Sequence, residues 1–169
     1  MPHNPAPTLS FFVYVTPIGK ITIIADDISI VGIHFGDVRK SNSKILLLAR
    51  EKETDLTEKA ALELEEYFKG LRTSFTLPLA PRGTPFQMQV WNALLAIPYG
   101  ETRSYKEIAL AIKKPSASRA VGMAIHRNPI AILIPCHRVI GADGSLTGFA
   151  HGIPMKEKLL KLEGHSFLQ

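Results

Sequence analysis

A single cysteine is the residue of this sequence with the clearest chemical potential. Cys136 is the only cysteine among 169 residues, and it lies in "ILIPCHRVIG", residues 132–141. The thiolate, rather than the thiol, attacks as a nucleophile, and neighbouring positive charge favours it. His137 supplies a titratable group and Arg138 a positive charge directly after the cysteine. Pro135 restricts the backbone before it. The pattern therefore indicates a positioned thiol.

The segment before Cys136 decides what this thiol can do. The apolar run at residues 130–134 predicts a buried strand that ends near the cysteine. Free cysteine is often buried and inert. Adjacent side chains on a strand point to opposite faces, so His137 would need a turn or a bridging water to act on the thiol. The motif alone leaves a structural cysteine, a protease, a lyase and a reductase open.

The composition predicts a soluble globular protein, because 46% of the residues are apolar. A single cysteine makes no internal disulfide and excludes the usual zinc clusters, so we expect no metal. Apolar runs stay far below the roughly 18 residues that a membrane span needs. The amino terminus lacks a basic stretch and a cleavage pattern, so we expect no secretory signal and a cytoplasmic location.

The net charge of +5 is divided unevenly along the chain. Residues 1–80 hold nine Lys and Arg against ten Asp and Glu, a net −1, whereas residues 81–169 hold eleven against five, a net +6. Such an excess is typical of a nucleic-acid-binding surface, although many basic proteins bind none. The segment "LPLAPRGTP", residues 77–85, is typical of a linker. We therefore predict one domain over 1–80 and a second over 81–169.

The first half predicts a small antiparallel sheet followed by a helix. "SFFVYVT", "KITIIA" and "ISIVGIHF" are rich in strand-forming residues and are separated by turn signals. Asp55 and Glu58 form a capping-box pair for the helix, and Gly70 stands at its C-terminal cap. The apolar stripe of this helix comprises Ala60, Ala61, Leu64, Tyr67 and Phe68. No chemical motif appears here, so we expect a support domain.

The second half predicts mainly helices. A start signal at Thr84 opens a helix that Pro98 ends, and Ser104 and Glu107 cap a second helix. The apolar positions of the first are Phe86, Val90, Trp91, Leu94 and Leu95. The turn "KKP" leads to a third helix, residues 116–127, which makes a helix-turn-helix candidate. The predicted fold class is α/β (α+β), with a winged-helix-like carboxy-terminal domain.

The helix at 116–127 has an unusual composition. Arg119 interrupts a surface of small residues, which are Ala117, Ser118, Ala120, Gly122 and Ala124. A helix of this kind can enter a narrow groove closely, and it can equally pack tightly against another helix. Its composition alone leaves both interpretations open.

Four stretches together give the sequence a family resemblance. "GTPFQMQVWNALLAIPYGETRSYKEIA", "SASRAVGMAIHRNP", "ILIPCHRVIG" and "KEKLLKLEGH" resemble the 6-O-methylguanine-DNA methyltransferase family of direct-reversal DNA repair proteins. The resemblance runs from about residue 83 to 165, with the motifs in order and at the expected gaps. The first half, including "TPIGKITIIADD", is loosely similar to the amino-terminal domain of that family.

The resemblance implies a catalytic role for five residues. Cys136 takes the alkyl group from the exocyclic oxygen of guanine, irreversibly and once per molecule, as a suicide cysteine S-methyltransferase. A soft thiolate suits displacement at a methyl carbon. His137 deprotonates the thiol through a water, and Glu163 orients the imidazole. Tyr105 donates a proton to the leaving base, and Asn128 braces the segment that holds the nucleophile.

The resemblance also implies that the damaged base is flipped out of duplex DNA, because its alkylated oxygen is otherwise buried in the stack. Arg119 fills the vacated place, and its small neighbours let the helix lie in the minor groove. The other implied DNA-binding residues are Tyr105, Lys106, Ala117, Ser118, Ala120 and Gly122. The backbone around Val139 and Ala150 reads the guanine. His151 stands where the family usually has glycine, and a ring there favours methyl over bulky adducts.

The implied partner is double-stranded DNA that contains 6-O-alkylguanine, with a monomeric protein and no membrane or metal. No cofactor is expected, because the alkyl donor is the DNA and no nucleotide-binding glycine motif appears. Three alternatives are set against this prediction. A non-catalytic lesion binder would lack the acceptor Cys136, and a helix-turn-helix regulator would need base-reading polar side chains on the helix at 116–127. A thiol hydrolase would leave Arg119 without a purpose.

Overall fold

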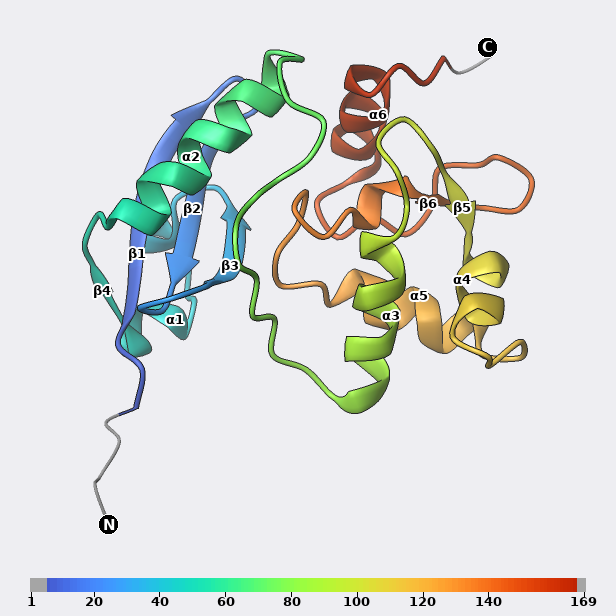
Figure 1. The fold of residues 1–169 in the computed structure, drawn as a ribbon, viewed down its shortest axis with the longest axis horizontal. Helices are drawn as coiled ribbons and strands as arrows, with labels where there is room; N and C mark the ends of the chain where they lie inside the picture. Colours follow the sequence, from blue (N-terminus) through green and yellow to red (C-terminus); the bar gives the residue numbers. More distant parts are fainter. Residues whose placement is uncertain (1–5, 167–169) are drawn as a thin grey trace. The chain divides into compact units, whose positions relative to one another are not determined.

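The computed structural model describes residues 6–166, and the chain divides between Pro81 and Arg82 into two compact units (Figure 1). The first unit is a sheet covered by a helix, and the second is mainly helical. This is the mixed α/β fold class that the sequence predicts. Over the described residues, no helix combines the length and the apolar character that crossing a membrane requires.

A four-stranded sheet in the order β3-β2-β1-β4 forms the first unit. Its strands are β1 (Leu9–Thr16), β2 (Gly19–Ala25), β3 (Ile30–Phe35) and β4 (Ala49–Glu51). The first three pair antiparallel, as predicted, whereas β4 pairs parallel with β1 and was not predicted. A 3-10 helix, η1 (Val38–Lys40), and the short α1 (Ile45–Leu48) precede β4. A three-residue strand is too short to show period-two alternation.

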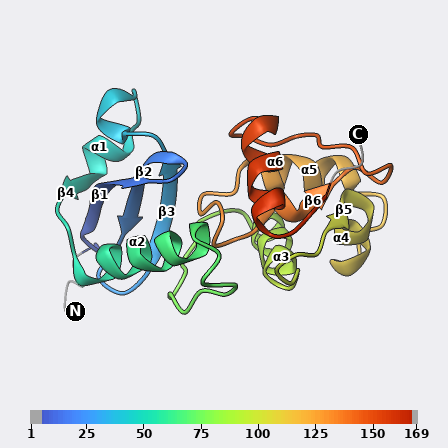
Figure 2. The ribbon, with the colours of Figure 1, turned by 90° about the horizontal axis from the view of Figure 1, so that it is seen from above.

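Helix α2 (Asp55–Phe68) packs across one face of this sheet (Figures 1 and 2). Four residues of the predicted apolar stripe are buried, which confirms them: Ala60, Leu64, Tyr67 and Phe68. The fifth, Ala61, is half-buried. The predicted capping box was wrong by one residue, since Thr54 and Thr57 form it. Thr54 has the extended backbone that an N-cap requires. Gly70, at φ +72°, adopts the left-handed conformation expected after the helix.

The second unit contains the other helices, α3 (Pro85–Leu95), α4 (Tyr105–Ala111), α5 (Ser118–His126) and α6 (Ile153–Leu162). Thr84 and Ser104 cap α3 and α4 through complete capping boxes, as predicted. Leu95, predicted on the apolar stripe, is 48% exposed. Helix α5 begins at Ser118 rather than at residue 116, so residues 112–117 connect it to α4 and the predicted three-residue turn was too short.

One short strand pairing positions the chemistry within this unit. Strands β5 (Arg103–Ser104) and β6 (Val139–Ile140) run parallel. Strand β5 leads directly into Tyr105, and β6 directly follows the 3-10 helix η2 (Cys136–Arg138). The pairing therefore brings the start of α4 near the cysteine turn. Trp91 Nε1 donates to the Ala124 carbonyl at 2.9 Å and fastens α3 to α5.

Candidate active site

A tight turn, and not the predicted strand, precedes the cysteine. The Ile134 N–H donates to the Ile130 carbonyl at 2.9 Å, and Ile132 lies at φ +73°. A β-branched residue in this region is strained, and such strain persists only where the surroundings enforce it. The Asn128 side chain accepts from the Ile130 N–H at 3.0 Å and donates to the Ile134 carbonyl at 2.8 Å. Asn128 therefore braces the turn.

Cys136 opens η2 and is only 4% exposed. Burial raises the pKa of its thiol, whereas the hydrogen bond with Asn128 and the positive charge of Lys156 act in the opposite direction. Because burial dominates, the thiol is protonated at neutral pH in the resting protein. The sulfur therefore needs a base before it can attack.

His137 provides a neutral imidazole next to that thiol. Its side chain is completely buried, and its Nε2 lies 2.7 Å from Glu163 Oε1. Burial lowers the pKa of His137, although the Glu163 carboxylate opposes this shift. A neutral imidazole can accept a proton at neutral pH. With Nε2 held by Glu163, Nδ1 faces away from the carboxylate.

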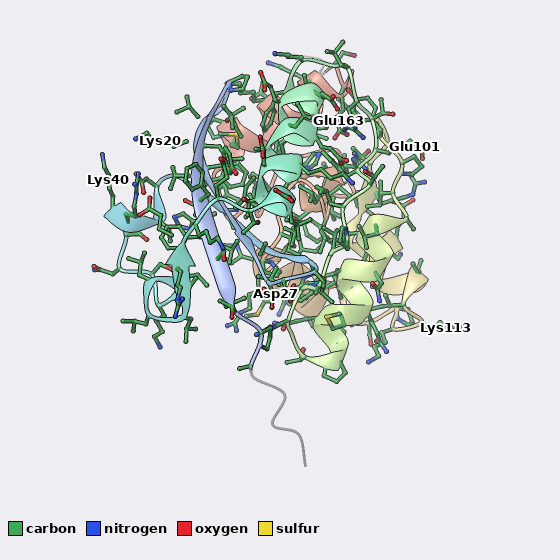
Figure 3. All side chains as sticks on the ribbon, turned by 60° about the vertical axis from the view of Figure 1, so that its left-hand side comes forward. Lys20, Asp27, Lys40, Glu101, Lys113 and Glu163 are labelled. Atoms are coloured by element: carbon green, nitrogen blue, oxygen red, sulfur yellow. The ribbon has the colours of Figure 1, made fainter. Side chains whose placement is uncertain are left out.

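Glu163, labelled in Figure 3, follows the last residue of α6 and collects donors from distant segments. Arg138 donates to both of its oxygens, from Nε at 2.9 Å and from Nη2 at 3.0 Å. The Gly100 N–H donates to the same carboxylate at 3.2 Å. Arg138 Nη1 also donates to the Ile97 carbonyl at 2.6 Å. From the sequence, we expected the positive charge of Arg138 to favour the thiolate of Cys136. In the structure, the Glu163 carboxylate compensates that charge.

Lys156 is the site residue that the sequence analysis missed. It is 1% exposed, and its Nζ donates to the carbonyls of Val139 and Thr147, the latter at 2.9 Å. Burial lowers its pKa to about 8, while the charge of Cys136 opposes the shift. Lys156, and not Arg138, is therefore the cation that favours the thiolate.

The sequence did contain a signal for this lysine. Lys156, Leu159, Leu160 and Glu163 are spaced i, i+3, i+4 and i+7, which places them on one face of a helix. All four are buried. Lys and Glu are almost never fully buried unless they are paired, so two of them on an apolar stripe indicate a functional site. Only Glu163 was singled out, because the family resemblance pointed to it.

A cavity of about 670 Å³ opens beside Tyr105. The Tyr105 hydroxyl donates to the Thr147 carbonyl at 2.8 Å. Burial raises the pKa of Tyr105, and the charge of Cys136 acts in the same direction, so the phenol keeps its proton. A side chain at Gly148, which has φ +68°, would come within 2.9 Å of the Tyr105 oxygen. Tyr105 therefore presents a protonated phenol to the cavity and interacts electrostatically with Cys136, although Cys136 itself does not line the cavity. Its other lining residues include Arg119, Gly122, Met123 and His126 from α5.

The remaining predicted DNA-binding residues lie on α4 and α5 or at their ends. Arg119 and Ala120 are exposed on α5, Ala117 is its N-cap and Ser118 its first residue. Lys106 is exposed on α4.

The three predicted pocket residues do not line the cavity. Val139 is buried, and its carbonyl accepts from Lys156. Ala150 and His151 are exposed before α6, where the His151 ring lies 5.4 Å from the Phe149 ring, edge to face. Within residues 6–166, no three His, Cys, Asp or Glu side chains converge so as to hold a metal ion.

Proteins of this class join a sheet unit to a helical unit that buries one thiol and an imidazole–carboxylate pair. Residues 85–165 match the family model described as "6-O-methylguanine DNA methyltransferase, DNA binding domain". Residues 11–81 match the model for the "ribonuclease-like domain" of the same family. The chain belongs to the 6-O-methylguanine DNA methyltransferase family.

Individual relatives agree with this assignment. A methylated-DNA--protein-cysteine methyltransferase of Methanosarcina barkeri is 54% identical over 149 residues, which cover 88% of this chain and 92% of the relative. The crystal structure of the Mycobacterium tuberculosis O6-methylguanine methyltransferase is 42% identical, with a TM-score of 0.83 and coverage of 92% and 93% of the two chains. A structure of M. tuberculosis OGT in complex with DNA is 44% identical, with a TM-score of 0.82 and coverage of 91% and 92%.

Proposed function

We propose that this protein repairs 6-O-alkylguanine in duplex DNA by transferring the alkyl group to its own Cys136. The observation that carries the proposal is a buried thiol at Cys136, followed in the chain by an imidazole that Glu163 holds, with the protonated phenol of Tyr105 close enough to Cys136 for the two to interact electrostatically. The relatives named as methylated-DNA--protein-cysteine methyltransferases support the reaction. The M. tuberculosis relative in complex with DNA supports a DNA substrate.

Activation of the thiol is the first step. A water carries the proton of Cys136 to the neutral His137, whose Nε2 is held by Glu163 at 2.7 Å. The carboxylate stabilises the imidazolium that forms. The ammonium of Lys156 stabilises the thiolate. Asn128 fixes the turn, so the sulfur is held in place while its charge develops.

Transfer of the alkyl group is the second step. The sulfur attacks the alkyl carbon, an S–C bond forms, and the bond between that carbon and the guanine oxygen breaks. The electron pair of the broken bond passes to the guanine, which takes a proton from the Tyr105 phenol. The proton held by His137 restores the phenol through solvent. The products are guanine and a thioether on Cys136, which neither water nor ordinary thiols readily reverse, so each molecule reacts once.

The flipped base is held through the second unit. Arg119 takes the place of the extruded guanine, and the small exposed face of α5 lets the helix lie in the minor groove. The positive charge of residues 81–169 contacts phosphates.

The backbone at Val139 and Ala150 reads the guanine, with His151 at the entrance. Lys106, Ala117, Ser118, Ala120 and Gly122 complete the DNA contact. The first unit acts as a support domain, and the protein acts as a monomer.

The test is the intact mass of the protein after incubation with a short duplex that contains one 6-O-methylguanine. An unmodified duplex and Cys136→Ser serve as controls. We expect one added methyl group per protein, located on Cys136, only with the damaged duplex. Tight binding to the lesion without a mass change would indicate a recognition protein and overturn the proposal. Repeated turnover would indicate a thiol hydrolase.

A further inference from the structure

Helix α5 carries one large apolar side chain on its exposed side. Met123 is 62% exposed, whereas the buried residues of the helix are Val121, Ala124 and Ile125. The neighbouring exposed residue Ala120 is small, and Gly122 has no side chain. Single exposed apolar residues are common on protein surfaces, so exposure alone has no functional meaning. What indicates a function for Met123 is its position on the helix.

Met123 lies between two hollows of the second unit. It lines the cavity of about 670 Å³ beside Tyr105, and it also lines a second hollow of about 210 Å³ together with Phe86 and Gln87 of α3. Its side chain therefore forms a ridge that both hollows share. Arg119 lies four residues earlier on the same helix, a rise of about 6 Å.

We propose that Met123 is a DNA contact that packs against sugars and base edges in the minor groove, one helical turn from Arg119. This inference rests on the proposed function, because it requires α5 to lie in that groove. Apolar side chains, methionine among them, act in the minor groove as wedges that hold a base step open. Methionine is also flexible enough to follow an irregular surface. Met123 would keep the opened step in place while Arg119 occupies the vacated position.

The competing explanation is that Met123 only forms the wall of the cavity that takes the base. The two explanations differ in their dependence on DNA. A wall residue changes reaction with the free base and with the duplex alike, whereas a groove contact changes reaction with the duplex more. The ratio of the two rates therefore separates them.

The experiment measures methyl transfer to the full chain from a damaged duplex and from free 6-O-methylguanine base. The variant is Met123→Ala. It should fold, because alanine has the highest helix propensity. The control is Leu110→Ala on α4, since Leu110 is 52% exposed and lines neither hollow. We expect the duplex-to-base rate ratio to fall about three- to tenfold for Met123→Ala, the range of a lost apolar contact. The ratio for Leu110→Ala should match that of the wild type.

Salt dependence gives a second readout. Met123→Ala removes no charge, so its slope of log affinity against log salt should equal that of the wild type, whereas Arg119→Ala should lower the slope by about one. An unchanged rate ratio in Met123→Ala, or an equal loss on duplex and free base, would overturn the inference. Absence of transfer by the wild-type protein from either substrate would instead refute the proposed function.

Discussion

The two units bury different kinds of polar side chains. Among the described residues, the first unit buries the phenol of Tyr67, one carboxylate and the hydroxyls of serine and threonine; the carboxylate is Glu63, and the hydroxyls are those of Ser10, Thr22, Ser29 and Thr57. The second buries only titratable groups: His137, Arg138, Lys156 and Glu163. A buried hydroxyl is satisfied by one or two local hydrogen bonds, as Thr22 is with the backbone of Gly36 and Val38. In the second unit, His137, Arg138 and Glu163 instead share one network of hydrogen bonds.

This difference separates a structural core from a reactive one. Removing ions from water costs several kcal/mol each, and replacing them with apolar residues is often neutral or stabilising. The second unit therefore keeps its charges for a reason other than stability. The thiol, the base and the proton donor all depend on that network. Variants in each unit test this difference.

The largest effect is expected for Glu163→Gln. The amide cannot balance Arg138 and also accept from the Gly100 N–H and orient His137, so a buried charge loses its partner. We expect the free energy of unfolding to fall by about 3–5 kcal/mol. The transfer rate should fall about 10³-fold because the base loses its orientation. Urea unfolding and single-turnover transfer measure both.

The matched control is Glu63→Gln in the first unit. Glu63 accepts from the N–H and the hydroxyl of Thr76. We expect a loss of about 1–2 kcal/mol in unfolding free energy and an unchanged transfer rate. Equal losses in the two variants would contradict the contrast between the units.

Tyr105→Phe should act on the reaction far more than on stability. The variant loses the proton donor, so transfer should slow about 100-fold. The lost hydrogen bond to Thr147 costs only about 1 kcal/mol. Tyr14→Phe is the control, because it also removes a partly buried hydroxyl that donates a hydrogen bond, to Thr57 at 3.1 Å in the first unit. A similar slowing in both variants would argue against a proton-donor role for Tyr105.

Lys156→Met should change how stability depends on pH. Burial lowers the pKa of Lys156 from 10.5 to about 8, so between these values the unfolded chain binds more protons than the native protein. Unfolding free energy due to this group therefore rises with pH across that window. All the proteins compared should carry Cys136→Ser, because the raised pKa of the thiol gives an opposing trend.

The measurement for this lysine is the unfolding free energy from below the lowered pKa of about 8 up to the ordinary value of 10.5, because Cys136→Ser also removes the contribution that raises this pKa. Three proteins are compared, each carrying Cys136→Ser: one with Lys156 intact, one with Lys156→Met and one with Lys158→Met. The rise should be absent in Lys156→Met and present in the control Lys158→Met, since Lys158 is exposed on the same helix. Parallel curves for all three proteins would show that Lys156 keeps an ordinary pKa.

The smallest effect is expected for His151→Gly. Under the proposed function His151 stands at the entrance for the base, so removing its exposed ring should speed transfer of a benzyl group relative to a methyl group, by roughly threefold. The methyl rate is the internal control for folding and chemistry. Identical benzyl-to-methyl ratios in the two proteins would show that His151 does not restrict the entrance.

Periodic elements of this fold were readable from the sequence. Strands β1 to β3 lie in the predicted runs of strand-forming residues, α2 and α3 carry predicted apolar stripes, and α3 and α4 have the predicted caps. The turn at residues 130–134 could not be read, because its β-branched run favours a strand. Asn128 overrides that preference by bonding to the backbone at both ends of the turn. A side chain several residues away thus changed the local structure.

The site was only partly readable. Cys136 and His137 were evident because they are adjacent and unusual in this sequence. The partner of His137 is Glu163, and no local pattern joins residues 26 positions apart. The role expected of Arg138 beside the thiol belongs to Lys156, because the sequence shows which charges are present but not which counter-ion each one meets. Such pairing is a property of the packed unit.

The carboxylate at the end of α6 also has a consequence for biosynthesis. Glu163 follows Cys136 by 27 positions and Lys156 by 7. A chain is made from its amino end, and earlier parts can fold first. Cys136 is therefore synthesised before the Lys156 ammonium and the Glu163 carboxylate that activate it. In a protein that spends its acceptor in one reaction, this order of assembly means that base-assisted transfer begins only after α6 has folded into place.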